Sequence, residues 1–356
     1  MEIDFSKREI LKYVGDLTQI FGVKEYTLTG GKSQGVRAVD VKNGTGLEFT
    51  VLPDRCMDIA WLSYKGINFS YISKTGIVSP QYYNEAGFNF LRSFYAGFLT
   101  TCGLRNVGTP CVENGESFGL HGRISNTPAE NVYSGIEWCD DKPVVRIRGR
   151  MREARVFGEN MILEREIVCR CGENKFTIED RVENYGFVEE PLMILYHFNL
   201  GYPLLQESAV LFAPTREVMP RDEEAQKGIE NYTRFQKPTP GYNEQVFYHD
   251  LRCDDNGNTC VALINDKLEL GVAIRFNKNE LFNFTQWKMM GEGEYVLGLE
   301  PCNCYVCGRE ESKKKGTIEY LKPGEIRKFK IEVEILDGMG SIDKLKNEIL
   351  NLSSKI

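Results

Sequence analysis

The runs VRAVDV at residues 36–41 and LEFTVL at residues 47–52 decide the fold class of this chain. Both are rich in β-branched and aromatic residues and alternate between apolar and polar positions, as half-buried strands do. Asn43-Gly44 between them is a turn signal typical of hairpins. A third such run, INFSYI, follows at residues 67–72. Short strand-like runs spaced about ten residues apart predict an antiparallel all-β protein.

The same pattern resumes in the second half of the chain. Strands are expected at residues 144–150, 161–168, 175–182, 261–264, 270–276, 295–299 and 327–335. Helices are expected only near the two ends. Ser6 and Glu9 have the spacing of a capping box and predict a helix from Ser6 to about Tyr13. A second helix is expected over residues 341–352, with Ile342, Leu345, Ile349 and Leu352 on one face. We therefore expect one β-sandwich domain over residues 1–356, with short N- and C-terminal helices.

Three segments do not fit a strand pattern. Residues 74–132 are rich in glycine and aromatic residues without clean alternation, and a segment of that length inside a compact domain is usually functional. Residues 220–241 are charged, are bounded by prolines and are interpreted as a surface excursion. Residues 313–315 are three lysines beside Glu310 and Glu311, which favours a solvated loop over a nucleic-acid patch.

Composition excludes several classes of function. The formal net charge of -7 argues against a nucleic-acid partner. No apolar run approaches the roughly 18 residues of a membrane span, and the first residues lack the apolar core of a signal peptide. Eleven cysteines, an odd number without secretory context, indicate reduced and mostly buried thiols. We expect a cytoplasmic protein that binds neither nucleic acid nor membrane.

Three polar residues stand in unusual contexts. His121 lies between glycines in GLHGRISNTPAE at residues 119–130, and it is one of only three histidines. His197 lies in LYHFNLGYP at residues 195–203, and Glu300 lies in LGLEPCN at residues 297–303. Burying such a glutamate without a partner is costly. If the three side chains meet, two imidazoles and a carboxylate supply an acid and a base near neutral pH. Each residue alone is also explained by a turn or a buried strand position.

Other chemistry has weaker support. Cys302, Cys304 and Cys307 have the spacing Cys-x-Cys-x-x-Cys without a second ligand pair, so simple packing is favoured over zinc binding. Trp287 either offers its flat face to a sugar ring or packs in the core. The chain contains no phosphate-binding glycine loop and no Gly-x-Ser-x-Gly elbow.

Together these residues resemble the galactose mutarotase-like superfamily, and more closely its aldose 1-epimerase-like branch, the DUF4432 family. The matching pieces are LPDRCMDI at 52–59, GFLTTCGL at 97–104, LHGRISNTPA at 120–129, HFNLGYP at 197–203 and GLEPCN at 298–303. The resemblance covers roughly residues 5–335. It implies a β-supersandwich with a sugar-binding cleft on one sheet, and an enzyme that needs no cofactor or metal.

The resemblance also implies roles for the three polar residues. Glu300 is expected to take the proton from the anomeric hydroxyl, His197 to protonate the ring oxygen, and His121 to hold that oxygen. Rotation about the C1–C2 bond and reclosure then give the other anomer. The expected substrate-binding residues are Arg92, Arg123, Asn199, Glu244, Trp287 and Asn303. The matches of Arg92, Arg123 and Glu244 are loose.

The leading hypothesis is therefore a sugar mutarotase of the aldose 1-epimerase type. A non-catalytic carbohydrate-binding protein on the same fold is the alternative. A glycoside-processing enzyme would need a second carboxylate, for which Glu244 is the candidate. Two roles are open for Arg92 and Arg123: they bind the phosphate of a phosphorylated sugar, or they form structural ion pairs. A homodimer is also left open.

The hypothesis has geometric consequences. His121, His197 and Glu300 should converge on a common void without hydrogen-bonding one another into a closed cluster. Trp287, or another aromatic residue, should line the same void. His249 should lie outside the site, because residues 247–251 have the pattern of an ordinary strand edge.

Overall fold

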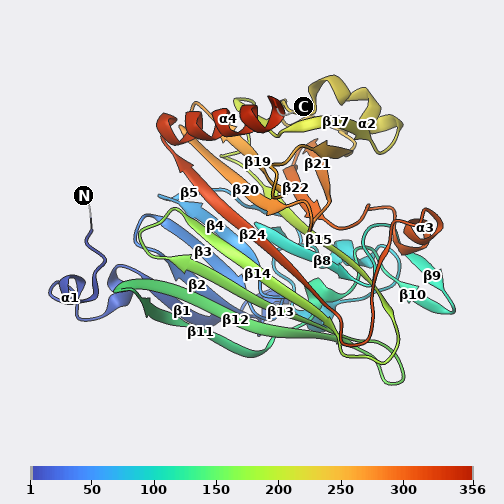
Figure 1. Cartoon of the computed structure of the whole chain (residues 1–356), viewed down its shortest axis with the longest axis horizontal. Coiled ribbons are helices and arrows are strands. Elements are labelled where there is room, and N and C mark those ends of the chain that lie inside the picture. The colour runs from blue at the N-terminus through green and yellow to red at the C-terminus, as the bar shows by residue number, and fades with distance from the viewer. Residues whose placement is uncertain (1–2, 355–356) are drawn as a thin grey trace.

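The computed structural model describes residues 3–354, and three antiparallel sheets dominate it (Figure 1). The eight-stranded sheet contains, in spatial order, β11 Glu130–Cys139, β12 Lys142–Ala154, β13 Asn160–Arg170, β14 Lys175–Asn184, β24 Ile326–Asp337, β20 Leu270–Asn277, β19 Asn258–Asn265 and β16 Ala209–Phe212. The five-stranded sheet contains β1 Gly22–Thr27, β2 Arg37–Lys42, β3 Leu47–Leu52, β4 Asp58–Tyr64 and β5 Ile67–Asn68.

The third sheet has seven strands and carries two of the three polar residues singled out above. It runs in the order β17 Thr215–Pro220, β18 Gln245–Leu251, β21 Asn283–Gly291, β22 Glu294–Cys302, β15 Glu190–Leu200 and β23 Glu319–Leu321, with β8 Leu99–Leu104 also paired to β15. Two small ribbons complete the strands: β9 Cys111–Glu113 with β10 Glu116–Phe118, and β6 Tyr71–Ile72 with β7 Ala96–Gly97. The all-β architecture expected from the sequence is confirmed.

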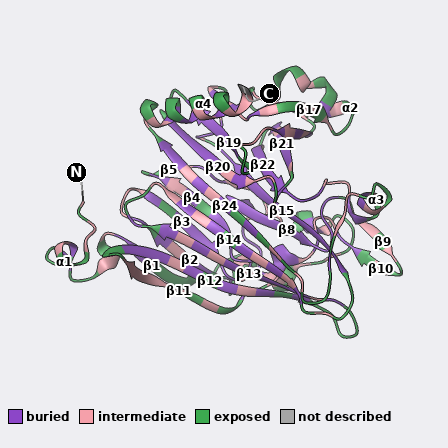
Figure 2. Cartoon of the chain, in the orientation of Figure 1, coloured by how far each residue is buried: buried purple, intermediate pink, exposed green. Residues whose placement is uncertain are grey.

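The main core lies between the eight-stranded sheet and the other two sheets. Phe176 of β14 stacks on Phe49 of β3 with ring centroids 4.7 Å apart, and Phe276 of β20 stacks on Phe284 of β21 at 6.3 Å. Phe98, just before β8, contacts Phe176 as well. The alternation seen in the sequence therefore reflects one face turned to this core, as in other packed sheets. In Figure 2 the central strands are largely buried, while the outer sides of the helices are exposed.

A buried ion cluster joins all three sheets. Arg165 of β13 contacts Asp180 of β14 at 2.6 Å and Asp58 of β4 at 2.8 Å, and all three side chains are fully buried. Its guanidinium also donates to Thr101 of β8 at 2.8 Å. Tyr196 of β15 donates its hydroxyl to Asp180 at 2.7 Å. The pKa of Asp58 is raised to about 6 because burial disfavours its charge more than Arg165 favours it.

Four α-helices lie at the periphery of the part of the chain that the structure describes: α1 Lys7–Ile10, α2 Glu223–Lys227, α3 Arg309–Lys314 and α4 Met339–Ser354. The C-terminal helix α4 is confirmed, with Ile342, Leu345 and Ile349 buried against the outer side of β19 and β20 (Figure 1). The N-terminal helix is shorter than predicted. Ser6 occupies the N-cap position, but its side chain makes no capping hydrogen bond, and the helix ends after one turn.

Other sequence-based expectations need correction. Residues 67–72 do not form one strand, because Phe69 and Ser70 interrupt β5 and β6. Lys313 and Lys314 lie in α3, where they pair with Glu113 and Glu310. The excursion after residue 220 contains α2, whose N-cap Asp222 accepts a hydrogen bond from the backbone of Ala225 at 2.9 Å. The prediction of one domain over residues 1–356 stays a prediction.

The segment 74–132 is less irregular than expected, because it contains β7, β8, β9 and β10. Its irregular parts cover the outer face of the seven-stranded sheet near β8 and β15. A separate apolar cluster forms there, in which Phe90 packs with Cys102 of β8, Leu195 of β15 and Cys302 of β22. Covered on one side by this segment and on the other by the main core, β15 is buried along its whole length. That double burial explains why an almost continuous apolar run carries His197. No helix within residues 3–354 is long and apolar enough to cross a membrane.

Candidate functional site

His197 and Glu300 meet on neighbouring strands of the seven-stranded sheet. The pairing of Leu195 with Cys302 and of Phe198 with Leu299 puts His197 of β15 opposite Glu300 of β22. His197 Nε2 lies 3.3 Å from Glu300 Oε1. The exposed fractions are only 5% and 2%. The two groups are close because side chains in one row of adjacent strands necessarily lie near one another. No hydrogen bond joins them through Glu300 Oε1, and the expected common void stays a prediction.

His121 reaches this pair from the irregular segment. Its ring centroid lies 6.0 Å from that of His197, at an interplanar angle of 79°. Its backbone has a φ of 59°, a left-handed conformation that costs of order 1–2 kcal/mol for a residue with a Cβ atom. His121 Nδ1 accepts a hydrogen bond from the Gly108 backbone at 3.4 Å. The site thus brings together three side chains that lie 76 and 103 residues apart in sequence.

Steric constraints explain why a glycine follows His121. Gly122 has a φ of 73°, and a Cβ atom there would lie 2.2 Å from the carbonyl oxygen of Gly103. Residues 121–123 also bond to β8: Gly103 N donates to the His121 carbonyl and Arg123 N donates to the Gly103 carbonyl, each at 3.0 Å. The sequence His-Gly therefore lets the chain pass close to β8 while presenting the imidazole to His197.

Aromatic rings and a polar pair surround the histidines. His197 contacts Trp287 of β21 at 5.4 Å and Phe94 at 5.3 Å between ring centroids. Trp287 Nε1 donates to Glu244 Oε2 at 2.8 Å, and Arg221 donates to Glu244 Oε1 at 3.0 Å. Trp287 thus packs against His197, and its expected role in sugar binding stays a prediction. Its indole is fixed in that place by Glu244.

Three buried polar atoms in this region lack hydrogen-bond partners. They are Glu300 Oε1, His197 Nδ1 and Asn199 Oδ1. The contact between His197 and Glu300 is close, but its geometry is not that of a hydrogen bond. Native proteins leave few buried polar atoms unpaired, because each one costs about 1–3 kcal/mol. Such a cluster is typical of a site where a polar ligand completes the hydrogen bonding.

Burial sets the protonation of the pair. The pKa of His197 is lowered to about 3 by burial and by the neighbouring His121. The pKa of His121 is lowered to about 4 by burial. The pKa of Glu300 is raised well above its ordinary value by burial and then by the negative charge of Glu244. Burial therefore favours the uncharged form of each group, a neutral imidazole on His197 and a protonated carboxyl group on Glu300.

Gly298 makes room for this arrangement. It lies two residues before Glu300 on β22 and pairs with Trp287 on one side and Asn199 on the other. A Cβ atom at this position would lie 2.5 Å from Glu300 Oε1 and 3.3 Å from His197 Cε1. A side chain at this position would therefore displace the carboxylate.

The structure does not support every expected substrate-binding residue. Arg123 is surrounded by four carboxylates, from Glu85, Glu116, Glu153 and Glu159, so its guanidinium is committed to structural ion pairs. The alternative of structural pairing is confirmed for Arg123, and its expected role in substrate binding stays a prediction.

Asn303 is fully buried, and its amide oxygen accepts from Ile194 N at 2.8 Å. Its amide nitrogen donates to the Leu192 carbonyl at 3.0 Å and to Glu319 Oε2 at 2.8 Å. The side chain therefore fixes the backbone of β15, and its expected role in substrate binding stays a prediction. Asn199 also bonds to backbone, donating to the carbonyls of Ala96 and His197 at 3.2 and 2.7 Å, but its oxygen stays unpaired.

The prediction for Arg92 is not tested by the structure, whereas the prediction for His249 is. Arg92 is exposed at the end of a 3-10 turn, Asn89–Arg92, and within the described residues it makes no side-chain hydrogen bond or ion pair. Its role in substrate binding stays a prediction. His249 bonds to Thr215 at 3.0 Å and Gln286 at 3.1 Å, and it faces the main core with Phe284. It lies outside the site as expected, although β18 is an internal strand and not a sheet edge.

Sequence reasoning missed three residues of this region. Phe94 lies in a segment without periodicity, so nothing in the sequence placed it against His197. Arg221 lies in the excursion and is placed only by its contacts with Asp222 and Glu244. Tyr248 lies in the same row as Glu300, through Thr285 of the intervening β21. Strand alternation could have given its face, because Tyr248 and Val246 alternate with Phe247 and His249.

Metal binding has little structural support. All eleven cysteines are free thiols, and among residues 3–354 no group of three or more His, Cys, Asp or Glu side chains is arranged to hold a metal ion. Cys302 and Cys304 are buried in the apolar cluster beneath the irregular segment. The thiols therefore pack as small apolar groups.

The sandwich of three sheets and the position of the site define a galactose mutarotase-like fold. A protein described as a candidate aldose 1-epimerase from Klebsiella pneumoniae has a TM-score of 0.91 and 25% identity, over 99% of this chain and 95% of its own. A galactose mutarotase-like protein from Clostridium acetobutylicum has a TM-score of 0.64 and 15% identity, over 90% and 99%. Galactose 1-epimerase from Lactobacillus acidophilus has a TM-score of 0.57 and 14% identity, over 89% and 99%.

The chain belongs to the family described as domain of unknown function DUF4432, whose model matches residues 33–335. No curated protein matches the chain. The family membership predicted from the five sequence pieces is confirmed.

Proposed function

We propose that this protein interconverts the anomers of a sugar by general acid–base catalysis. The observation that carries the proposal is the buried His197–Glu300 pair, with His121 beside it and unpaired polar atoms on Glu300, His197 and Asn199. One sugar hydroxyl can donate to Glu300 and a second to Asn199, and a sugar oxygen can accept from an imidazole, so a sugar would satisfy these atoms. The aromatic rings of Trp287 and Phe94 suit the apolar face of a sugar.

One proton on the pair is sufficient for the reaction. The reaction starts when the proton of the pair passes from Glu300 to His197. The ionised Glu300 then accepts the proton of the anomeric hydroxyl. His197 then donates its proton to the ring oxygen as the bond from that oxygen to C1 breaks. The product is the open-chain carbonyl form, and rotation about C1–C2 followed by the reverse transfers gives the other anomer. Protons balance, and the pair ends with the single proton it began with.

His121 is assigned to the ring oxygen. Its lowered pKa keeps the imidazole neutral at neutral pH, so it can donate a hydrogen bond without adding a second charge beside His197. Its Nδ1 already accepts from Gly108, which leaves the proton on Nε2 and available to the substrate. This tautomer follows from the hydrogen bond made by the other ring nitrogen.

A neutral sugar is the first substrate to test. Arg123, one of two arginines expected to hold a phosphate, is enclosed by carboxylates, and Arg221 is paired with Asp222 and Glu244. Glu244 adds a negative charge at the rim, which opposes a phosphate. Support for a phosphorylated substrate therefore falls to Arg92 alone.

The test is anomer exchange measured by NMR on a panel of aldoses and ketoses. Wild-type protein should accelerate exchange of at least one sugar, and E300Q and H197N should each lose most of that acceleration, about 10²–10⁴-fold. H249N is the matched control, because His249 is an equally buried histidine on the opposite face of the same sheet. Saturable binding of a sugar without any acceleration would contradict catalysis and favour the non-catalytic binding protein.

A further inference from the structure

The side chain of Arg123 is held by more carboxylates than any single ion pair requires. Its Nη2 lies 2.6 Å from Glu85 and 3.1 Å from Glu116, and its Nη1 lies 3.3 Å from Glu159 and 3.5 Å from Glu153. Glu153 and Glu159 are almost completely buried. In a partly buried setting the planar guanidinium with five donors is well suited to bridge several carboxylates.

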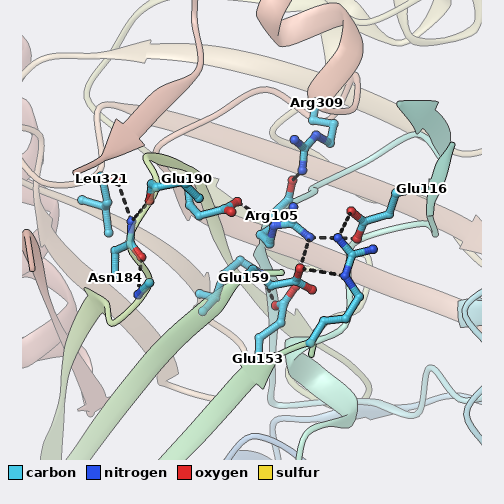
Figure 3. Close-up of polar contacts among 12 residues, drawn as sticks. Arg105, Glu116, Glu153, Glu159, Asn184, Glu190, Arg309 and Leu321 are labelled. Atoms are coloured by element: carbon cyan, nitrogen blue, oxygen red, sulfur yellow. Dashed lines mark hydrogen bonds and ion pairs between the residues drawn. The ribbon is translucent and has the colours of Figure 1, made fainter. Parts of the chain in front are cut away.

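These carboxylates come from separate parts of the fold. Glu85 belongs to the irregular segment, Glu116 to β10, Glu153 to β12, and Glu159 to the turn before β13. The second arginine of the cluster, Arg105, shares Glu116 at 2.8 Å and Glu159 at 3.1 Å. Figure 3 shows Glu116, Glu153 and Glu159 gathered around Arg105, with Arg309 bonded to its carbonyl from above. The cluster therefore ties the irregular segment to the eight-stranded sheet.

The backbone of Arg123 is equally fixed. Its N–H donates to the carbonyl of Gly103, and the N–H of Gly103 donates to the carbonyl of His121. Glu153, one of the carboxylates around Arg123, accepts from Leu104 N at 3.2 Å. Tyr83 donates its hydroxyl to the Gly122 carbonyl at 2.9 Å. Residues 121–123 are thus clamped between β8 and the cluster, with His121 in its strained left-handed conformation two residues from the anchored guanidinium.

We propose that Arg123 is the positioning residue of His121: anchored by the carboxylates of Glu85, Glu116, Glu153 and Glu159, it holds the backbone of residues 121–123 so that the His121 imidazole faces His197. Only the predicted effect of Arg123 on the rate rests on the proposed function; its effect on the position of His121 does not. Arg123 does not touch His121 or the His197–Glu300 pair in any contact described above, so it acts through the backbone and not on the substrate. Strain at a functional residue persists only where the surrounding structure enforces it.

The experiment compares R123Q and R123K with R155Q in the full-length protein. Arg155 contacts the same Glu116 and Glu159, at 3.3 and 3.4 Å, but belongs to the turn after β12 and has no link to residues 121–123. Nitrogen-15 NMR of the imidazoles is direct, because the chain has three histidines and H197N and H249N assign the other two. Steady-state anomer exchange gives kcat and KM for the same variants.

The expected result has two parts. R123Q should shift or broaden the His121 ring signals, with loss of the Nδ1 acceptor signature, while His249 stays unchanged and R155Q resembles wild type. The kcat of R123Q should fall about 10- to 100-fold with KM changed less than about 3-fold, since a small misplacement of a catalytic group has effects of that size. R123K should lie between, because an ammonium group keeps the charge but cannot bridge four carboxylates.

Two outcomes would overturn the proposal. One is an unchanged His121 spectrum in R123Q, and the other is an equal change in R155Q. Should R123Q fail to fold, the same comparison between R123K and R155Q decides. If wild-type protein does not accelerate anomer exchange, the proposed function is wrong, while the imidazole spectra still decide whether Arg123 positions His121.

Discussion

Replacing Gly298 by alanine adds one methyl group beside the two reacting groups. The new carbon would lie 2.5 Å from Glu300 Oε1, 2.9 Å from Trp287 Cβ and 3.3 Å from His197 Cε1. The first distance is about 1 Å below the roughly 3.5 Å at which unbonded heavy atoms are at rest. Because Trp287 Cβ blocks the other side, the carboxylate has to move by about that amount relative to His197. A displacement of about 1 Å in a catalytic group reduces the rate on the order of 10²-fold, which is about 2.7 kcal/mol in the activation barrier.

Stability should change less than activity. Crowding a packed position costs about 1–3 kcal/mol, and alanine regains about 0.5–1 kcal/mol over glycine in a strand. We therefore expect G298A to stay folded with a net loss of about 0–2 kcal/mol in the free energy of unfolding.

The assay for G298A is anomer exchange by NMR, with denaturant unfolding on the same preparation. G291A is the control, because Gly291 ends β21 in the same sheet and a Cβ atom there meets only the mobile end of Met289, at 2.9 Å. G291A should retain full activity. A folded G298A with wild-type kcat, or an equal loss in G291A, would refute the steric reasoning.

Two further predictions concern charge. In E244Q the pKa of Glu300 should fall, because the charge of Glu244 raises that pKa and the freed Arg221 lowers it. Anomer exchange needs the proton held by the pair, so its rate should decline at a lower pH in E244Q than in wild type. The control E223Q, on α2, should leave the pH–rate profile unchanged. R165M should lower the free energy of unfolding by about 3–5 kcal/mol, because Asp58 and Asp180 lose their buried cation. The loss in the free energy of unfolding should be larger at pH 8 than at pH 5. Without Arg165 the pKa of Asp58 in the folded protein rises further, so the folded variant binds a proton that the unfolded chain releases. Raising the pH therefore disfavours the folded variant. R181M, a half-exposed arginine on β14 paired with Glu164 and Glu183, should lose no more than about 1 kcal/mol in chemical denaturation, and similar losses in both variants would contradict the argument.

Local pattern was sufficient for several long strands and for the C-terminal helix, but not for strands such as β1, β4 and β8. The alternation in residues 327–335 follows one buried face of β24, and Ile342, Leu345 and Ile349 form the buried stripe of α4. The same reasoning failed at Ser6, where a capping pattern was present but tertiary structure supports only one helical turn. Alternation reports burial, and it therefore predicts an element wherever burial decides its conformation.

The site was accessible from sequence only through context. Unusual surroundings identified His121, His197 and Glu300, but no pattern fixes the register that puts His197 opposite Glu300. The ion pairs of Arg123 could not be foreseen, because its partners are 7 to 38 residues away in sequence and come from two strands, a turn and a loop. The same holds for Asn303, since two of its bonds are to the backbone of β15, more than 100 residues earlier. Long-range pairing of this kind leaves no local trace.

His197 and Glu300 lie on adjacent strands, and this fixes the distance between them. Hydrogen-bonded neighbouring strands are spaced about 4.8 Å apart in any sheet, and changes in the loops do not alter that spacing. The separation of the two groups is thus built into the ladder between β15 and β22, whereas Trp287, Phe94, Glu244 and His121 reach them from β21 and from irregular segments. Changes in those segments can therefore reshape the surroundings of the proposed sugar site while the distance between His197 and Glu300 stays constant.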